Sequence, residues 1–133
     1  MPALKIEADR ERVEEVMEFV DGQLEAHACS VKSQTQLDIA VDELFANIAR
    51  YAYGGETGEA VIEIEFPEGF AAITFRDWGT PFNPLEHPDP DVTLPAEKRQ
   101  IGGLGIYMVK KSMDSVSYRY EDGQNILTIR RKL

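Results

Sequence analysis

The segment from Leu37 to Tyr53 constrains the fold most, because its apolar residues recur at the spacing of an α-helix. Its apolar stripe consists of Leu37, Ala40, Val41, Leu44, Ile48 and Ala52. A helix with one apolar stripe must bury that stripe against another layer of structure. The rest of the chain therefore has to supply a layer that covers this helix.

Alternating apolar and polar residues predict strands that can form this layer. The predicted strands are Leu4–Ala8, Ala60–Phe66, Phe70–Arg76, Val116–Tyr120 and Ile126–Arg130. Turn residues separate the second strand from the third (Pro67-Glu68-Gly69) and the fourth from the fifth (Asp122-Gly123). Strands joined by such short turns pair in the antiparallel direction.

Capping signals predict where the first two helices begin and end. Asp9 is the expected N-cap of a first helix that runs to about residue 28. Ser33 and Gln36 have the form of a capping box, with Ser33 as the N-cap of the central helix. Gly54-Gly55 is expected to end that helix.

The order of the predicted elements indicates the fold class. A last helix opens at Gly102-Gly103-Leu104-Gly105 and runs to about Met113, which gives the order βααββ-loop-αββ. This order predicts a single domain over residues 1–133 with an α+β fold. We expect a two-layer α/β sandwich with helices on one face of a mixed, largely antiparallel sheet.

Charge and composition exclude several classes of function. Lys plus Arg is 14 and Asp plus Glu is 24, so the net charge is −10, which argues against a nucleic-acid-binding surface. The single cysteine, Cys29, excludes a disulfide within the chain. Because the sequence has neither a signal-peptide pattern nor an apolar run of membrane-spanning length, we expect no membrane association and a cytoplasmic location.

Glu43 and Asn47 form the first candidate site, because they lie four residues apart on one face of the central helix. An amide oxygen such as that of Asn47 is a suitable ligand for Mg²⁺, and a neighbouring carboxylate can act as a general base. Each residue adjoins the apolar stripe and therefore lies at the edge of the core. A Glu and an Asn four apart are more often a solvated surface pair, which spacing alone favours.

Asp77-Trp78-Gly79 forms the second candidate site, directly after a predicted strand. A carboxylate at a strand end can accept a hydrogen bond from an exocyclic amine, and Gly79 lets a planar ring approach the backbone. A strand-terminating turn explains the same residues equally simply.

The glycines of the last helix form the third candidate site, since exposed N–H groups at a helix N-terminus bind phosphate oxygens. A flexible hinge is the simpler explanation of a lone glycine cluster. A loop with five prolines (Pro81, Pro84, Pro88, Pro90 and Pro95) separates the second site from the third, and a long loop without regular structure is often functional.

Taken together, the three sites resemble those of a GHKL-type ATP-binding domain, and the closest likeness is to the bacterial anti-sigma-factor serine/threonine kinases. The resemblance covers essentially the whole chain. It implies that Asn47 coordinates Mg²⁺ bridging the ATP phosphates and that Glu43 is the general base on the acceptor hydroxyl. It also implies that Asp77 binds the adenine amino group and that Gly79 supports the ring.

The resemblance extends to the phosphates and to the loop that covers them. It implies that Gly103, Leu104 and Gly105 contact phosphates through the backbone and that Arg50 touches a phosphate. Residues 82–100 would form the ATP lid, in which Lys98 and Arg99 are further basic candidates.

Two residues depart from the family pattern. Tyr51 stands where the family often has His, and Pro81 replaces the second glycine of the usual Asp-x-Gly-x-Gly. Neither change removes the implied metal ligand or base.

The resemblance implies an ATP-dependent serine/threonine protein kinase that phosphorylates a small anti-sigma antagonist protein and sequesters a sigma factor. The alternative is an ATP-switched protein-binding module without significant phosphoryl transfer. A third alternative, an α+β domain without a ligand, requires the three sites to coincide by chance. Related kinases often dimerise, so a homodimer through the first strand and helix is possible.

Overall fold

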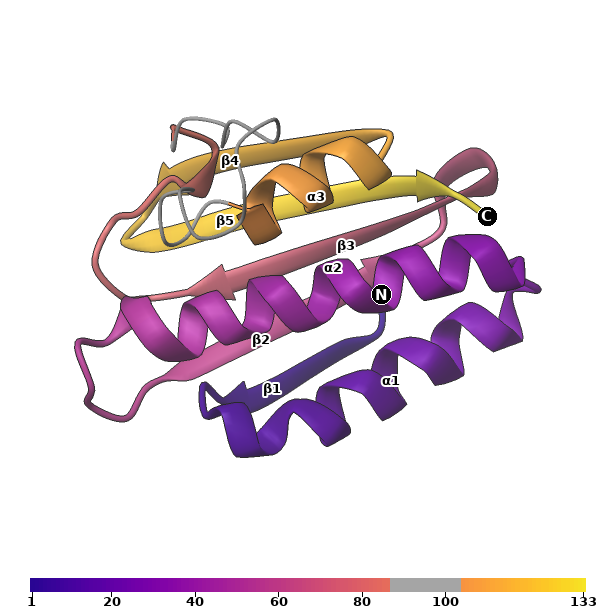
Figure 1. Ribbon diagram of the computed structural model, residues 1–133. Coiled ribbons are helices and arrows are strands. Elements are labelled where there is room, and N and C mark those ends of the chain that lie inside the picture. The colour runs from indigo at the N-terminus through magenta and orange to yellow at the C-terminus, as the bar shows by residue number, and fades with distance from the viewer. Residues whose placement is uncertain (87–103) are drawn as a thin grey trace.

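The computed structural model describes residues 1–86 and 104–133, and within them five strands form one sheet with three α-helices packed on it (Figure 1). The helices are α1 (Val13–Ala26), α2 (Val31–Asn47) and α3 (Leu104–Ser112). The strands are β1 (Ala3–Glu7), β2 (Glu59–Glu65), β3 (Phe70–Asp77), β4 (Ser115–Glu121) and β5 (Gln124–Lys132). Short helical turns are η1 (Arg10–Arg12), η2 (Ile48–Ala52), η3 (Pro67–Gly69) and η4 (Pro84–Glu86).

The sheet has the strand order β1-β2-β3-β5-β4, and each of these neighbouring pairs is antiparallel. The sheet was predicted as mixed and largely antiparallel; in the part of the chain that the structure describes, it is antiparallel in every pairing. The pairing of β3 with β5 aligns Asp77 with Asn125, although these residues are far apart in sequence. This register determines which side chains meet at one end of the sheet.

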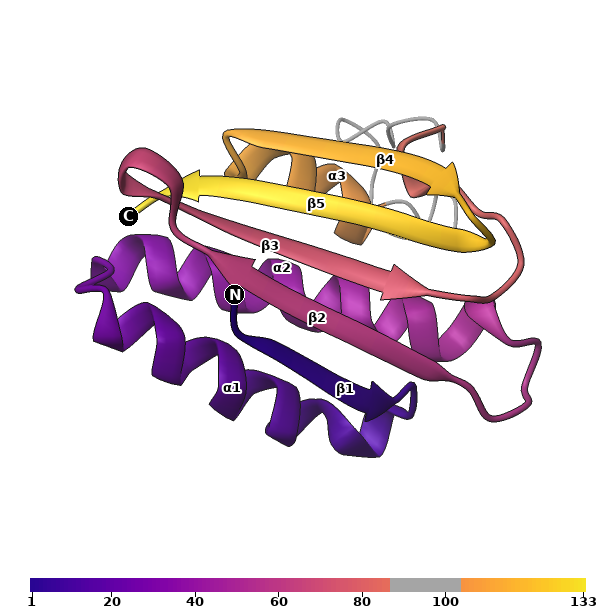
Figure 2. The same cartoon turned by 180° about the vertical axis from the view of Figure 1, so that it is seen from behind.

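All three helices lie on the same face of the sheet, as Figures 1 and 2 show from opposite sides, so the predicted two-layer α+β fold is confirmed. The core forms between the layers. It includes the fully buried side chains Val16, Val20 and Leu24 of α1, Leu37, Val41 and Phe45 of α2, and Ile62, Ile64, Ile73 and Ile129 of the sheet. The predicted stripe of α2 is therefore the buried face, with Phe45 as a further member.

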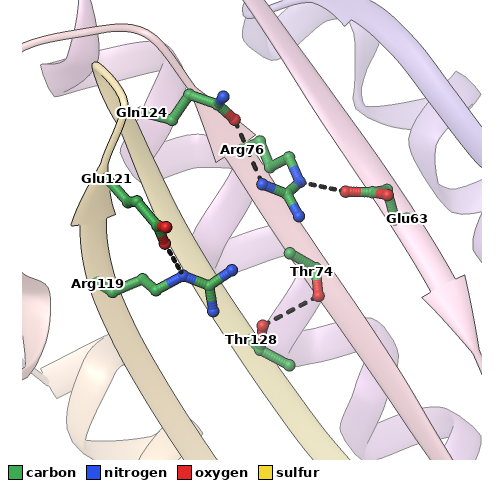
Figure 3. A network of polar contacts seen from close by, with 7 residues as sticks. All are labelled: Glu63, Thr74, Arg76, Arg119, Glu121, Gln124 and Thr128. Atoms are coloured by element: carbon green, nitrogen blue, oxygen red, sulfur yellow. Dashed lines mark hydrogen bonds and ion pairs between the residues drawn. The ribbon is translucent and has the colours of Figure 1, made fainter.

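The opposite face of the sheet carries polar side chains that bond to one another across strands (Figure 3). Arg76 of β3 forms an ion pair with Glu63 of β2 and also donates to Gln124 of β5. The hydroxyls of Thr74 and Thr128 are 2.9 Å apart. Alternation of apolar and polar residues thus gives the sheet one buried face and one polar face.

The predicted start of α2 was wrong, because the N-cap is Ser30 rather than Ser33. The hydroxyl of Ser30 accepts a hydrogen bond from the backbone N–H of Ser33 at 3.2 Å. Ser33 is buried inside the first turn, where its hydroxyl donates to the carbonyl of Lys132 at 2.8 Å. Its side chain therefore ties α2 to β5 and is not free to cap the helix.

The end of α2 is irregular in a way that the sequence did not predict. The α-helix stops at Asn47 and continues as the π-helical turn η2, after which Gly54 adopts a φ of 59°. The hydroxyl of Tyr53 then donates to the carbonyl of Glu59 and accepts from the backbone N–H of Trp78. These bonds fix the end of the helix against the strand ends where the candidate site lies. π-Turns inside helices are rare and frequently occur at functional sites.

Candidate functional site

A pocket lies between the last turns of α2 and η2 and the adjoining ends of β3, β4 and β5. Its empty volume is about 470 Å³, the open mouth included. Most of the lining is apolar or aromatic with a few polar groups, which is the usual composition of a small-molecule site. The lining residues are Leu44, Asn47, Ile48, Tyr51, Ala52, Phe75, Asp77, Thr80, Phe82, Pro84, Tyr118, Asn125 and Leu127.

Asp77 is the last residue of β3 and its side chain is buried in the wall of this pocket. Its Oδ1 accepts hydrogen bonds from the backbone N–H of Gly79 at 3.0 Å and from Nδ2 of Asn125 at 2.9 Å. Because both of these donors meet Oδ1, Oδ2 is the oxygen that can accept a bond from a ligand. This geometry suits recognition of an N–H donor such as an exocyclic amine.

Gly79 packs against the end of the helix. A Cβ added at Gly79 would lie 2.1 Å from the carbonyl oxygen of Ala52, and the next residue, Thr80, donates its N–H to that same oxygen at 2.9 Å. Only a residue without a side chain lets the loop after β3 approach η2 this closely. The structure thus gives a packing reason for glycine here, and contact with a planar ring stays a prediction.

Asn47 and Glu43 lie one turn apart on α2 and both are half-buried. Asn47 lines the pocket. The carboxylate of Glu43 instead meets the first turn of α3, where a Cβ added at Gly105 would lie 2.2 Å from its Oε1. Asn47 and Asp77 therefore line the same pocket, whereas the carboxylate of Glu43 lies against Gly105.

Arg50 lies on η2 with an exposed side chain, and its guanidinium carbon is 5.6 Å from the centre of the Tyr51 ring. It does not line the pocket among the residues that the structure describes, so its contact with a phosphate stays a prediction. Tyr51, which departs from the family pattern, lines the pocket together with Phe82, and their ring centres are 5.8 Å apart. Both side chains are about half exposed, so they form an aromatic rim at the pocket mouth.

Two residues of the pocket, Asn125 and Tyr118, were not predicted as site residues from the sequence. Both line the pocket, and the hydroxyl of Tyr118 donates to Oδ1 of Asn125. Burial raises the pKa of Tyr118 above its ordinary value of 10.0, which keeps the hydroxyl protonated as a donor. A signal was present for Asn125, because alternation places it on the same buried face as Leu127 and Ile129. A polar residue on such a face calls for a partner.

Several predicted site residues lie at or beyond the edge of the described chain. Gly103 and most of the predicted lid, including Lys98 and Arg99, lie outside residues 1–86 and 104–133. Leu104 is the first residue of α3. The roles implied for these residues stay predictions.

Comparison with known protein families and curated proteins gives consistent matches. The sequence pattern of the histidine kinase-like ATPase domain family matches residues 6–131. The serine-protein kinase RsbW of Listeria monocytogenes serovar 1/2a is 32% identical over 103 residues, which cover 74% of this chain and 66% of that protein. RsbW of Bacillus thuringiensis strain Al Hakam is 30% identical over 95 residues, covering 68% of this chain and 59% of that protein. The chain thus spans about two thirds of the length of these relatives, or somewhat less.

Solved structures show the same fold at lower identity. A crystal structure of RsbU and RsbW domains from Mycobacterium tuberculosis aligns with a TM-score of 0.64 and 14% identity, over 100% of this chain and 33% of that one. The Acinetobacter baumannii histidine kinase AdeS aligns with a TM-score of 0.53 and 17% identity, over 99% of this chain and 68% of that one. With the family match over residues 6–131, these findings establish that the chain belongs to the histidine kinase-like ATPase domain family.

Proposed function

We propose that this chain is an ATP-dependent serine/threonine protein kinase that acts as an anti-sigma regulatory factor. It would phosphorylate a small anti-sigma antagonist protein and sequester a sigma factor. The similarity to the RsbW serine-protein kinases supports this proposal. The observation that carries it is the series of contacts along one side of α2 and η2: Ala52 with Gly79 beside Asp77, then Asn47, then Glu43 with Gly105.

This series matches the needs of a nucleoside triphosphate, which carries a base at one end and phosphates at the other. Ala52 and Glu43 are nine residues apart, so the two ends of the series are separated by about 13 Å at the rise of an α-helix. Asp77 would bind the adenine amino group at one end through Oδ2, since its Oδ1 already accepts from Gly79 and Asn125. The N-terminal turn of α3, which carries a partial positive charge, would hold phosphates at the other end.

The residues present fit a magnesium ion bound together with the phosphates. Asn47 offers a neutral amide oxygen next to the pocket, and no cluster of three His, Cys, Asp or Glu side chains that could hold a metal occurs in the described part of the chain. Mg²⁺ commonly takes only one or two protein ligands and completes its shell with water and substrate phosphates. When bound, the ion would neutralise phosphate charge during transfer.

Glu43 would be the general base of the transfer. Its carboxylate lies beside the start of α3, and there it could accept the proton of an acceptor serine hydroxyl. Phosphoryl transfer depends mainly on positioning and on charge neutralisation, so few protein groups suffice.

The contact between Glu43 and Gly105 also favours an alternative, in which the chain is an ATP-switched protein-binding module without significant transfer. In that case the Glu43 carboxylate would only hold the first turn of α3 in place, and bound ATP would change the surface offered to a partner. The two functions differ in whether Glu43 moves a proton.

Transfer from γ-labelled ATP to candidate antagonist domains separates these functions. The variants are Glu43→Gln, which keeps the size of the side chain, and Asp42→Asn, a matched control on the exposed side of the same helix. If the chain is a kinase with Glu43 as its general base, Glu43→Gln should lower the transfer rate at least about hundredfold while the affinity for ATP changes little. Transfer that continues unchanged in Glu43→Gln would exclude the general-base role, and ATP binding without any acceptor would favour the module.

The proposed partners need separate tests. Pull-down with and without ATP from the native host should retain a sigma factor and an antagonist domain.

A homodimer can form through β1, which is an edge strand of the sheet, and through α1 beside it. Light scattering of the purified chain measures whether it is a monomer or a dimer.

No helix within residues 1–86 and 104–133 is long and apolar enough to cross a membrane.

A further inference from the structure

Asn125, the second residue of β5, has a buried carboxamide whose hydrogen-bonding capacity is fully used. Its Nδ2 donates to Oδ1 of Asp77 at 2.9 Å and to the carbonyl of Thr80 at 3.0 Å, with the carbonyl of Gly79 at 3.4 Å. Its Oδ1 accepts from the backbone N–H of Phe82 at 3.1 Å and from the hydroxyl of Tyr118. If the nitrogen and oxygen of this amide were exchanged, the NH₂ group would face the donors of Phe82 and Tyr118, and the oxygen would face the acceptors of Asp77 and Thr80. The network therefore fixes the orientation of the carboxamide.

The place of Asn125 in the sheet makes this network unusual for a core position. Asn125 pairs directly with Asp77 across the antiparallel β3–β5 ladder, and its next neighbours on the same face are the buried Leu127 and Ile129. A buried amide costs free energy unless it is bonded, and a polar network that is fully bonded specifies one arrangement of its members. A polar side chain at this position therefore selects a particular local structure.

The first consequence of the network concerns the loop after β3. Asn125 bonds to Thr80 and Phe82, which flank Pro81 on either side. Proline has no N–H, so the loop cannot donate a backbone hydrogen bond at that residue. Since Thr80 and Phe82 both line the pocket, the carboxamide of Asn125 holds this part of the pocket wall.

The second consequence concerns the carboxylate that faces the ligand. With Nδ2 of Asn125 and the N–H of Gly79 both bonded to Oδ1, Asp77 presents Oδ2 as an acceptor. An acceptor at this position favours a purine with an exocyclic amine over a purine with an oxo group. An oxo group would bring two acceptors together and leave both without a donor.

We propose that Asn125 is the positioning residue that gives this pocket its preference for a 6-aminopurine nucleotide, by fixing the carboxylate of Asp77 and the loop on both sides of Pro81. The inference rests on the proposed binding of ATP. It adds a residue on β5, remote in sequence from the strand-end Asp77, to the recognition of the base.

The test compares ATP with inosine triphosphate, in which an oxo group replaces the exocyclic amine, by titration calorimetry between pH 5.5 and 8.5. The variants are Asn125→Leu, Asn125→Asp and the control Gln124→Glu. The control makes the same amide-to-acid change one residue away, on the polar face of the sheet. Circular dichroism melts of each variant report whether it is folded.

Asn125→Leu is expected to bind ATP about tenfold or more weakly and inosine triphosphate only slightly more weakly, so that the ratio of the two affinities narrows. Asn125→Asp places two carboxyl groups side by side, and these cannot both ionise easily. Its ATP affinity should therefore rise as the pH falls and a proton is shared, while the wild type and Gln124→Glu lack this dependence.

Loss of affinity by the same factor for both nucleotides, with no new pH dependence in Asn125→Asp, would overturn the inference and leave the proposed function standing. If Asn125→Leu fails to fold, the pH profile of Asn125→Asp decides. A wild-type chain that binds no adenine nucleotide would overturn the proposed function and this inference together.

Discussion

Substituting Gly79 by alanine tests the contact that joins the loop after β3 to the end of the helix. The added Cβ would lie 2.1 Å from the carbonyl oxygen of Ala52 and 2.5 Å from its carbonyl carbon. Ordinary non-bonded contact needs about 3.5 Å, so the loop and the helix end must separate by about 1.4 Å. Because both atoms belong to the backbone, no side-chain rotation can relieve the clash. We expect a loss of about 2–3 kcal/mol in the free energy of unfolding, in the upper part of the range for overpacking.

Urea unfolding and thermal melting measure this loss, which corresponds to a fall of roughly 6–12 °C in Tm. The separation should also break the bond from the N–H of Thr80 to Ala52, so the exchange of that amide with solvent should speed up. The control is Gly22→Ala on α1, where an added Cβ meets nothing within 4 Å and helix propensity predicts a gain of up to about 1 kcal/mol. The steric argument would be refuted if Gly79→Ala had the same Tm as Gly22→Ala and the Thr80 amide exchanged with solvent at its wild-type rate.

Three further substitutions probe other contacts. Gly105→Ala would meet the carboxylate of Glu43, a flexible group that can turn away. We expect its unfolding free energy to change by less than about 1 kcal/mol in urea titrations. Transfer from labelled ATP should nevertheless fall about tenfold or more, and unchanged transfer would contradict the role of this contact. Tyr53→Phe removes two hydrogen bonds that join the end of η2 to the strand ends and should lower the free energy of unfolding by about 1–2 kcal/mol in urea titrations. A free energy of unfolding equal to that of the wild type would contradict this. Burial, then the hydrogen bond that the protonated Asp38 carboxyl donates to Asp21, together with the negative charges of Asp21 and Glu25, raises the pKa of Asp38 from 3.8 to about 7. The folded chain therefore holds a proton that the unfolded chain releases, so stability falls as the pH rises from about 4 to 7. Asp38→Asn removes this dependence and should gain about 1 kcal/mol at pH 8, a figure reduced because the side chain is partly exposed. The urea midpoints of the wild type and of Asp38→Asn are compared at pH 5 and pH 8. An equal change of midpoint with pH in the two proteins would contradict the role of Asp38.

The strands could be predicted from the sequence because alternation is a local pattern with a period of two. The second strand was predicted as Ala60–Phe66 and is Glu59–Glu65, and its buried residues are the ones that the alternation put on one face. A shift of one residue in pairing would expose that whole face, so the pattern leaves little freedom. The stripe of the central helix was predicted for the same reason.

The start of that helix could not be predicted, because the sequence offers two serines three residues apart. Ser30 and Ser33 are both good N-caps by residue type. The choice depends on β5, since the buried hydroxyl of Ser33 bonds to the carbonyl of Lys132 and accepts from Arg131. These partners lie nearly one hundred positions along the chain, beyond the reach of any local signal.

In the candidate site, too, the residues that follow a local pattern could be predicted and those that depend on distant packing could not. Glu43 and Asn47 could be paired from the sequence because helical spacing puts them on one face, and Asp77 because it directly follows a strand. Asn125 and the contact of Gly79 with Ala52 depend on strand register and on the packing of η2. The alternation around Asn125 did contain the hint of a buried polar group, but its partner could be named only once β3 and β5 were paired.

The contacts of α2 and η2 with two glycines position the elements on either side of the site. The helix meets glycine at both ends of the site, with Glu43 against Gly105 and Ala52 against Gly79. The contact of Gly79 with Ala52 is between backbone atoms and is too close for a side chain, so η2 fixes the position of the loop after β3, whereas Glu43 reaches the start of α3 through its flexible carboxylate. Because a helix is stiff along its axis, a ligand that spans the pocket meets polar groups at a spacing already fixed before it binds. Such preorganisation lowers the entropic cost of binding, and it makes this helix the element that determines which length of ligand fits.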